Sequence, residues 1–150
     1  LEFRRVLFRS GGLCRRLVGM ERFGQIKRLA ADGSLKNVDL MVGDISRNST
    51  DTLSAELTAA NFGNVAEDAS GADLAAGVVN LVLQAIGTMT VLATKTCPAK
   101  EVILTGSITT LDQTRPNIET FERFYGIRYI IPENATFATA YGAALHALEK

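Results

Sequence analysis

Residues 101–131 read EVILTGSITTLDQTRPNIETFERFYGIRYII, and their pattern indicates the fold class. Glu101 to Thr105 is rich in β-branched residues and predicts a strand that ends in Gly106-Ser107. Asn117 to Tyr125 predicts a helix, and Arg128 to Ile131 predicts a second strand. Strands that alternate with helices in this way predict an α/β domain with crossover connections.

The same alternation continues outward from this stretch. Apolar residues recur at helical spacing from residue 13 to residue 29 and predict one amphipathic helix, which Gly33 ends. Val38 to Val42 predicts a short strand closed by Gly43-Asp44, and residues 46–56 predict an exposed loop. The other predicted elements are a turn rich in small residues over Leu57 to Asn64, a long helix over residues 71–95 and an Ala-rich terminal helix over residues 135–148.

Residues 74–94 carry no charge and are numerous enough to cross a bilayer as a helix. However, Asn80, Gln84 and Thr88 recur every four residues, so they form a polar stripe along one helix face. The sequence therefore predicts a central core helix here, not a membrane span.

Charge and composition exclude several classes of protein. The chain has 150 residues, with 16 basic and 16 acidic side chains and a net charge of zero. That balance argues against a nucleic-acid partner or an anionic membrane surface. Hydrophobic residues make up 47%, which is typical of a folded globular domain. Cys14 and Cys97 are too few for a disulfide scaffold and are predicted to be reduced, buried thiols of a cytoplasmic protein, with a disulfide as the alternative.

Residues 1–10, LEFRRVLFRS, differ from the rest of the chain. They lack an initiator Met and the apolar core of a signal peptide, and they contain three arginines. An Arg-rich transit peptide and a cloning or assembly scar both remain open. We expect residues 1–10 to be a non-native or leader segment, and residues 11–150 to be the C-terminal domain of a longer protein.

Several residues could carry chemistry. Gly106-Ser107 stands at the carboxyl end of a predicted strand, where ligands bind in open α/β sheets. The glycine would let a nucleotide approach the backbone and the serine could donate to it, although an ordinary turn is the alternative. Asp44 either binds a metal or hydroxyl or bonds its own turn. Because His146 is the only histidine, a catalytic triad and a zinc site are excluded, and no metal ligand is assigned.

Two groups near the C-terminus have two interpretations each. Phe121, Phe124 and Tyr125 lie within about one helical turn, and they either wall a pocket or pack in the core. Asn134 is interpreted as the N-cap of the terminal helix. The small residues that follow Asn134 either permit close helix packing or leave room for a ligand.

Three segments, in this order, resemble the type II pantothenate kinases, a family of the actin–hexokinase kinase superfamily. The first is Gly43-Asp44-Ile45 followed, after a loop, by Glu56-Leu57-Thr58-Ala59-Ala60-Asn61-Phe62-Gly63. The second is Ile103-Leu104-Thr105-Gly106-Ser107. The third is Glu133-Asn134-Ala135-Thr136-Phe137-Ala138-Thr139-Ala140-Tyr141-Gly142-Ala143. The resemblance covers about residues 11–150.

The resemblance implies the truncated C-terminal lobe of an actin-like, ribonuclease-H-like ATPase fold. It further implies transfer of the ATP γ-phosphate to pantothenate, the first step of coenzyme A synthesis, by a cytoplasmic homodimer that uses ATP with Mg²⁺. Neither nucleic acid nor a membrane is an expected partner. The resemblance implies that the nucleotide is bound by Gly12, Phe23, Gly106 and Ser107. It implies that pantothenate is bound by Asp44, Ile45, Thr58, Ala59, Ala60 and Phe121.

The chain also departs from the family pattern. The family's phosphate loops and catalytic glutamate belong to its N-terminal part, so no catalytic residue is assigned here and the isolated chain is expected to be inactive. Ser46 replaces an aromatic residue, and Ala135 and Thr139 stand where glycine is usual. Two alternatives remain: a related kinase with a sugar or N-acetylhexosamine acceptor, and a non-catalytic dimerising module. Residues 58–63 favour pantothenate, because sugar kinases need carboxylates and amides that match sugar hydroxyls.

Overall fold

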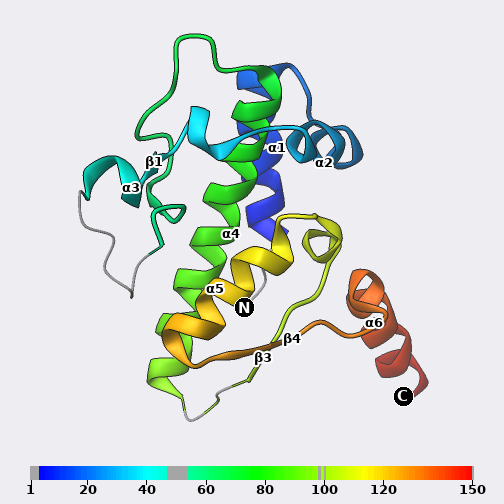
Figure 1. Ribbon diagram of the computed structural model, residues 1–150. Helices are drawn as coiled ribbons and strands as arrows, with labels where there is room; N and C mark the ends of the chain where they lie inside the picture. Colours follow the sequence, from blue (N-terminus) through cyan, green and yellow to red (C-terminus); the bar gives the residue numbers. More distant parts are fainter. Residues whose placement is uncertain (1–3, 47–53, 98, 100, 150) are drawn as a thin grey trace. The chain divides into compact units, whose positions relative to one another are not determined.

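A computed structural model describes residues 4–46, 54–97, 99 and 101–149, and of residues 4–9 it describes the backbone (Figure 1). Helices and short strands are mixed along the chain. Two compact units result, Leu1–Val82 and Leu83–Lys150. Their boundary falls within the longest helix, α4 (Gly71–Thr96), so each unit receives part of that helix.

The predicted single helix over residues 13–29 is wrong, because the chain forms two helices there. Helix α1 spans Arg4–Val18 and α2 spans Phe23–Ala31. Gly19 between them has φ +70°, a left-handed conformation that ends a helix and that glycine adopts without a Cβ clash. The apolar spacing continued across the break, so the periodicity alone did not reveal it. Helix α1 also includes residues 4–10, whose non-native origin stays a prediction.

The middle of the first unit is a small antiparallel pair of strands. Strand β1 (Leu40–Met41) pairs with β2 (Thr58–Ala60), with Leu40 opposite Ala60. The predicted strand over residues 38–42 is shorter because Val42 begins the short helix α3 (Val42–Ile45), and the 3-10 turn η1 (Leu35–Asn37) ends just before residue 38. The predicted turn over residues 57–64 contains a strand. Of the predicted loop over residues 46–56, positions 47–53 lie outside the described residues, and the others are exposed.

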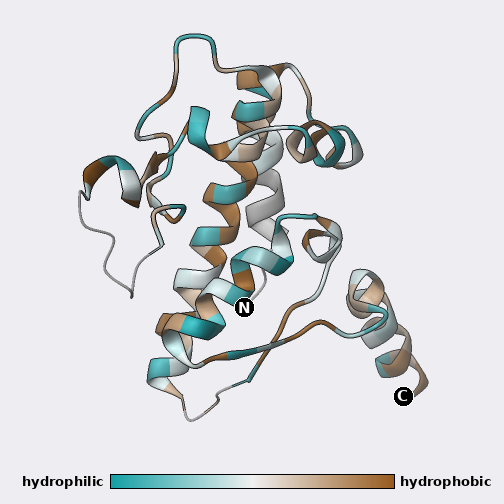
Figure 2. Ribbon diagram, viewed as in Figure 1, coloured by the Kyte–Doolittle hydropathy of each residue, from teal (hydrophilic) through white to brown (hydrophobic). Residues whose placement is uncertain are grey.

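Helix α4 supplies buried side chains to the cores of both units. Its buried apolar residues include Ala75, Val78 and Val79 in the first unit and Leu83 and Ile86 in the second. Bands of hydrophobic and hydrophilic residues alternate along it (Figure 2). In the described part of the chain it alone is long and apolar enough to cross a membrane, and 67% of its most apolar window is buried within the protein.

The second unit contains the predicted strand–helix–strand arrangement. Strand β3 (Glu101–Ile103) pairs in parallel with β4 (Arg128–Ile130), and α5 (Thr114–Tyr125) lies between them in the chain (Figure 1). Strand β3 is shorter than the predicted 101–105, because the chain turns at Gly106 into η2 (Ser107–Thr110). The predicted helix over residues 135–148 divides into the 3-10 turn η3 (Ala135–Phe137) and α6 (Ala138–Leu148).

Close packing against α4 fixes α5 and β4 in this unit. A Cβ on Gly87 of α4 would lie 2.2 Å from the Phe121 ring, so the ring occupies the space that a side chain would fill. Phe121 also stacks on Tyr125, with ring centroids 5.8 Å apart. The Tyr129 hydroxyl is hydrogen-bonded to Thr90, whose hydroxyl donates to the Gly87 carbonyl at 2.7 Å. These contacts favour the core interpretation of Phe121 in this structure.

Candidate functional site

The two halves of the first motif meet in the structure. The backbone N–H of Val42 donates to the carbonyl of Leu57 at 2.8 Å, and that of Gly43 donates to the carbonyl of Ala55 at 3.0 Å. Together with the β1–β2 pairing, these bonds place the Gly43-Asp44-Ile45 segment beside the start of the Thr58–Gly63 segment. Backbone hydrogen bonds therefore join the two halves of the motif, which are separated in the sequence.

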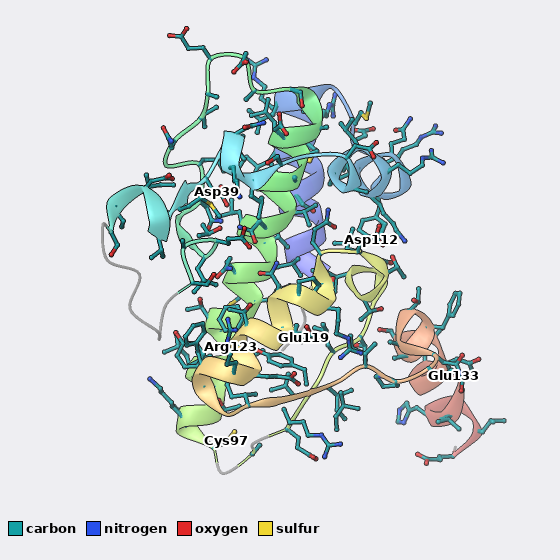
Figure 3. All side chains as sticks on the ribbon, in the orientation of Figure 1. Asp39, Cys97, Asp112, Glu119, Arg123 and Glu133 are labelled. Atoms are coloured by element: carbon teal, nitrogen blue, oxygen red, sulfur yellow. The ribbon has the colours of Figure 1, made fainter. Side chains whose placement is uncertain are left out.

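The carboxylate of Asp39 holds the second half of that motif. Asp39 is fully buried, and Figure 3 labels it in the first unit. Its Oδ1 accepts the backbone N–H of Phe62 at 2.8 Å. Its Oδ2 accepts the Thr58 hydroxyl at 3.1 Å and the side-chain amides of Asn61 at 3.3 Å and Asn80 at 2.8 Å. The buried charge is thus stabilised by hydrogen bonds from neutral donors, which buried carboxylates require.

The turn after β2 has a backbone conformation that needs such support. Phe62 has φ +54°, a left-handed conformation that is uncommon for a bulky residue. Its ring lies against α4, because a Cβ on Gly77 would come within 3.0 Å of the ring. Ala59 and Ala60, on β2 just before this turn, are exposed. A ligand can reach these two residues in the first unit.

The other candidate acceptor residues of the first unit differ in what they offer. The Thr58 hydroxyl donates to Asp39 and accepts from the side-chain amide of Asn80 at 3.0 Å, so its donor is already used inside the protein. The Asp44 carboxylate accepts the backbone N–H of Met41 at 2.8 Å, which is the turn-bonding alternative stated for Asp44 above. Ile45 is 64% exposed and presents an apolar side chain on the same short helix.

The candidate nucleotide turn follows β3 in the second unit. Gly106 has φ +92° and ψ 178°, a conformation that is almost confined to glycine. A Cβ placed on Gly106 would meet no heavy atom within 4 Å, so the space beside its backbone is open. Ser107 is half-buried at the start of η2. Backbone that a ligand can approach and a nearby hydroxyl are therefore both present.

The second and third motifs also meet. The backbone N–H of Gly106 donates to the carbonyl of Ala135 at 2.8 Å, and that of Leu104 donates to the carbonyl of Ile130 at 2.9 Å. Because β3 and β4 are parallel, the turns that follow them share the carboxyl edge of the sheet. Asn134 occupies the N-cap position of η3, the 3-10 turn that leads into α6, but its exposed side chain makes no capping hydrogen bond.

The predicted site residues are divided between the two units. Gly12 in α1 is exposed and Phe23 at the start of α2 is half-buried, and both belong to the first unit with the predicted acceptor residues Asp44, Ile45, Thr58, Ala59 and Ala60. Gly106, Ser107 and Phe121 belong to the second unit. Phe121 is buried against Gly87, whereas Thr139 is exposed and Ala135 is buried. The ligand contacts of these residues stay predictions.

The sequence patterns do not single out Asp39, and they place Asn80 only in a polar stripe along the predicted helix. A signal existed, because Asp39 is a single carboxylate within the predicted strand Val38 to Val42. Charged side chains are almost never fully buried without partners, so an acidic residue at such a position predicts a group of donors around it. Three of the four donors, Thr58, Asn61 and Phe62, belong to the first motif.

Two buried groups in the first unit have shifted pKa values. The backbone N–H of Ser34 and the hydroxyl and N–H of Ser70 donate to Asp73, and these bonds hold the pKa of its carboxyl well below the usual range. Burial raises the pKa of the Cys14 thiol to about 11, so it remains protonated and unreactive at neutral pH. The predicted burial of both thiols is wrong for Cys97, which is exposed after the end of α4.

In the second unit, burial raises the pKa of Tyr129, so its hydroxyl stays protonated. No group of three or more His, Cys, Asp or Glu side chains that could hold a metal ion occurs among residues 4–46, 54–97, 99 and 101–149.

Comparison with known proteins decides the family. A family model described as Fumble matches residues 9–142, and this range contains the first two motifs and all of the third except its last residue, Ala143. The chain belongs to the Fumble family. The resemblance to type II pantothenate kinases is thereby confirmed.

Individual relatives of this chain are named type II pantothenate kinases. The type II pantothenate kinase of Staphylococcus saprophyticus is 35% identical over 64% of this chain and 38% of its own length. That of Staphylococcus haemolyticus is 32% identical over 79% of this chain and 46% of its length. That of Bacillus cereus strain G9842 is 28% identical over 91% of this chain and 51% of its length. The chain thus spans at most about half of these relatives.

Proposed function

We propose that this Fumble-family chain is the nucleotide- and acceptor-binding part of a pantothenate kinase, which transfers the γ-phosphate of ATP to pantothenate in the first step of coenzyme A synthesis. The observation that carries the proposal is the family match over residues 9–142. Within this range the space beside the Gly106 backbone is open, and Ala59 and Ala60 are exposed. The fold expected for the complete protein is the actin-like kinase fold, with residues 11–150 in its C-terminal lobe. We expect this protein to be a cytoplasmic homodimer.

The nucleotide would bind at the turn that joins β3 to η2. The open backbone of Gly106 and the half-buried hydroxyl of Ser107 support this placement. Phosphoryl transfer depends mainly on positioning and charge neutralisation. Mg²⁺ usually reaches kinase sites with the substrate phosphates and a few carboxylates. No metal-binding cluster occurs in the described part of the chain, so we assign no Mg²⁺ ligand to it.

Pantothenate would bind beside β2. Ala59 and Ala60 present two small side chains and an exposed backbone there, and the Asp44–Ile45 segment is joined to the same motif by hydrogen bonds. The remaining contacts, the phosphate loops and the catalytic glutamate would come from the part of the family's sequence that this chain does not span. We therefore expect the isolated chain to bind ATP and pantothenate without catalysing phosphoryl transfer between them.

A fusion experiment tests the reaction and separates it from the alternatives. Residues 11–150 would be joined to the preceding half of the Staphylococcus haemolyticus relative, and consumption of ATP would be measured with pantothenate, glucose or N-acetylglucosamine. We expect turnover that depends on pantothenate. Turnover with a sugar alone would contradict the proposed acceptor. A folded fusion that consumes no ATP with any acceptor would favour the non-catalytic module.

A further inference from the structure

We propose that Asp39 is a positioning residue for the acceptor: its buried carboxylate fixes the Thr58–Phe62 turn in the shape that presents Ala59 and Ala60 to the ligand. The proposal rests on the proposed function, because it assigns Asp39 to the pantothenate side of that site. Asp39 itself does not touch the ligand, since its side chain is fully buried beneath the turn.

The hydrogen bonds define how the carboxylate acts. Three residues of the turn donate to Asp39, namely Thr58, Asn61 and Phe62, at 3.1, 3.3 and 2.8 Å. The fourth donor, Asn80, lies on α4 and connects the same carboxylate to the core helix at 2.8 Å. The exposed residues Ala59 and Ala60 therefore lie between two tethered positions of the turn, Thr58 and Asn61.

The donors are arranged so that only a carboxylate satisfies them. Oδ2 accepts three donors and Oδ1 accepts the Phe62 N–H, so both oxygens must be acceptors. An asparagine has the same shape but replaces one oxygen with an NH₂ group, which cannot accept. With its remaining oxygen toward the three clustered donors, the NH₂ would face the Phe62 N–H. Asp39→Asn would thus release the residue whose left-handed conformation closes the turn.

The first readout tests the turn without any ligand. In the 150-residue chain, hydrogen exchange of the Phe62 amide would be compared between the wild type, Asp39→Asn and the exposed control Asp68→Asn. We expect exchange about tenfold faster or more in Asp39→Asn, because each released buried bond contributes about a factor of 10 to protection. Asp68→Asn should leave it unchanged. Unchanged Phe62 exchange in a folded Asp39→Asn protein would overturn the proposal.

The second readout is the affinity for each ligand. A purely structural role of Asp39 would not weaken pantothenate binding while leaving binding of the ATP analogue unchanged. Dissociation constants for pantothenate and for a non-hydrolysable ATP analogue would be measured for the same proteins. Asp39→Asn should weaken binding of pantothenate about tenfold or more and change the affinity for the ATP analogue by no more than about twofold. The apparent affinity for pantothenate falls in proportion to the fraction of molecules whose turn has the binding-competent shape. Equal weakening of both ligands, or of neither, would overturn the proposal.

A milder variant covers the case in which Asp39→Asn does not fold. Asn61→Ala removes only the longest of the four bonds, at 3.3 Å, and should shift both readouts in the same direction by a smaller factor. Normal Phe62 exchange and normal pantothenate affinity in that variant would count against the proposal. If the wild type shows the protected Phe62 amide and binds the ATP analogue but no pantothenate, the proposed acceptor fails and the role of Asp39 toward it fails with it. The exchange result then still identifies Asp39 as the anchor of the turn.

Discussion

The backbone N–H of Gly106 donates to the carbonyl of Ala135 at 2.8 Å, although the two residues lie in different motifs. This bond joins the turn after β3 to the turn after β4 at one edge of the parallel pair. It depends on the orientation of the Gly106 peptide, which is set by φ +92°. The geometry of the candidate nucleotide turn is therefore sensitive to the residue at position 106.

Gly106→Ala tests that sensitivity. The conformation of Gly106 is strained for any residue with a Cβ, even though no atom lies within 4 Å of the added methyl. We expect a loss of about 1–3 kcal/mol in the free energy of unfolding, measured by urea denaturation. Gly142→Ala is the matched control, because Gly142 lies within α6 and alanine favours helices, so stability should rise by about 0.5–1 kcal/mol. Equal effects of the two changes would contradict the account.

Gly87→Ala tests the contact between α4 and α5. The new methyl would lie 2.2 Å from the Phe121 ring, so the ring must move, and overpacking of this kind costs about 1–3 kcal/mol. Phe121→Leu in the same protein should recover part of that loss, because leucine vacates the ring position. A double-mutant cycle in denaturant measures the coupling. Strictly additive effects would show that the two positions do not pack against each other.

Asp73 predicts a pH dependence of stability. Its pKa in the folded protein lies below the ordinary 3.8, first because of the Ser34 N–H and then because of Ser70. The stabilising contribution is therefore present above pH 3.8 and is lost as the pH falls through that value toward the folded pKa. Asp73→Asn should flatten the fall in melting temperature between about pH 5 and about pH 2, whereas Asp68→Asn should not. Parallel curves for wild type and Asp73→Asn would contradict this assignment.

Helix α6 predicts association of the isolated chain. None of its residues is buried, and the apolar residues Tyr141, Leu145 and Leu148 are 55%, 62% and 84% exposed. Exposed apolar surface of this kind drives association, so we expect a dimer or larger species by light scattering at micromolar concentration. Leu145→Glu should shift the population toward monomer, while Thr139→Glu on the same helix should not. A monomeric wild type would contradict the prediction.

The sequence predicted the strand–helix–strand order of residues 101–131 because β-branched strands and a Gly-ended helix leave strong local patterns. It failed at Gly19, because apolar spacing continued across a break that only the backbone conformation reveals. It also failed at Asp39, whose partners are far apart in the chain, with Asn80 forty-one positions away. Local sequence patterns identify the first motif. The buried carboxylate that supports it can be recognised only from the tertiary contacts of the folded chain.

The dissociation constants of ATP and pantothenate, measured for the wild type, Ser107→Ala and Ala60→Leu, test where the two ligands bind. Ser107→Ala removes one neutral hydrogen bond, and we expect about 2- to 13-fold weaker ATP binding with unchanged pantothenate binding. Ala60→Leu should do the opposite, because the larger side chain would fill the proposed acceptor position on β2. Ser107→Ala that weakens pantothenate and leaves ATP unchanged would contradict the placement of both ligands.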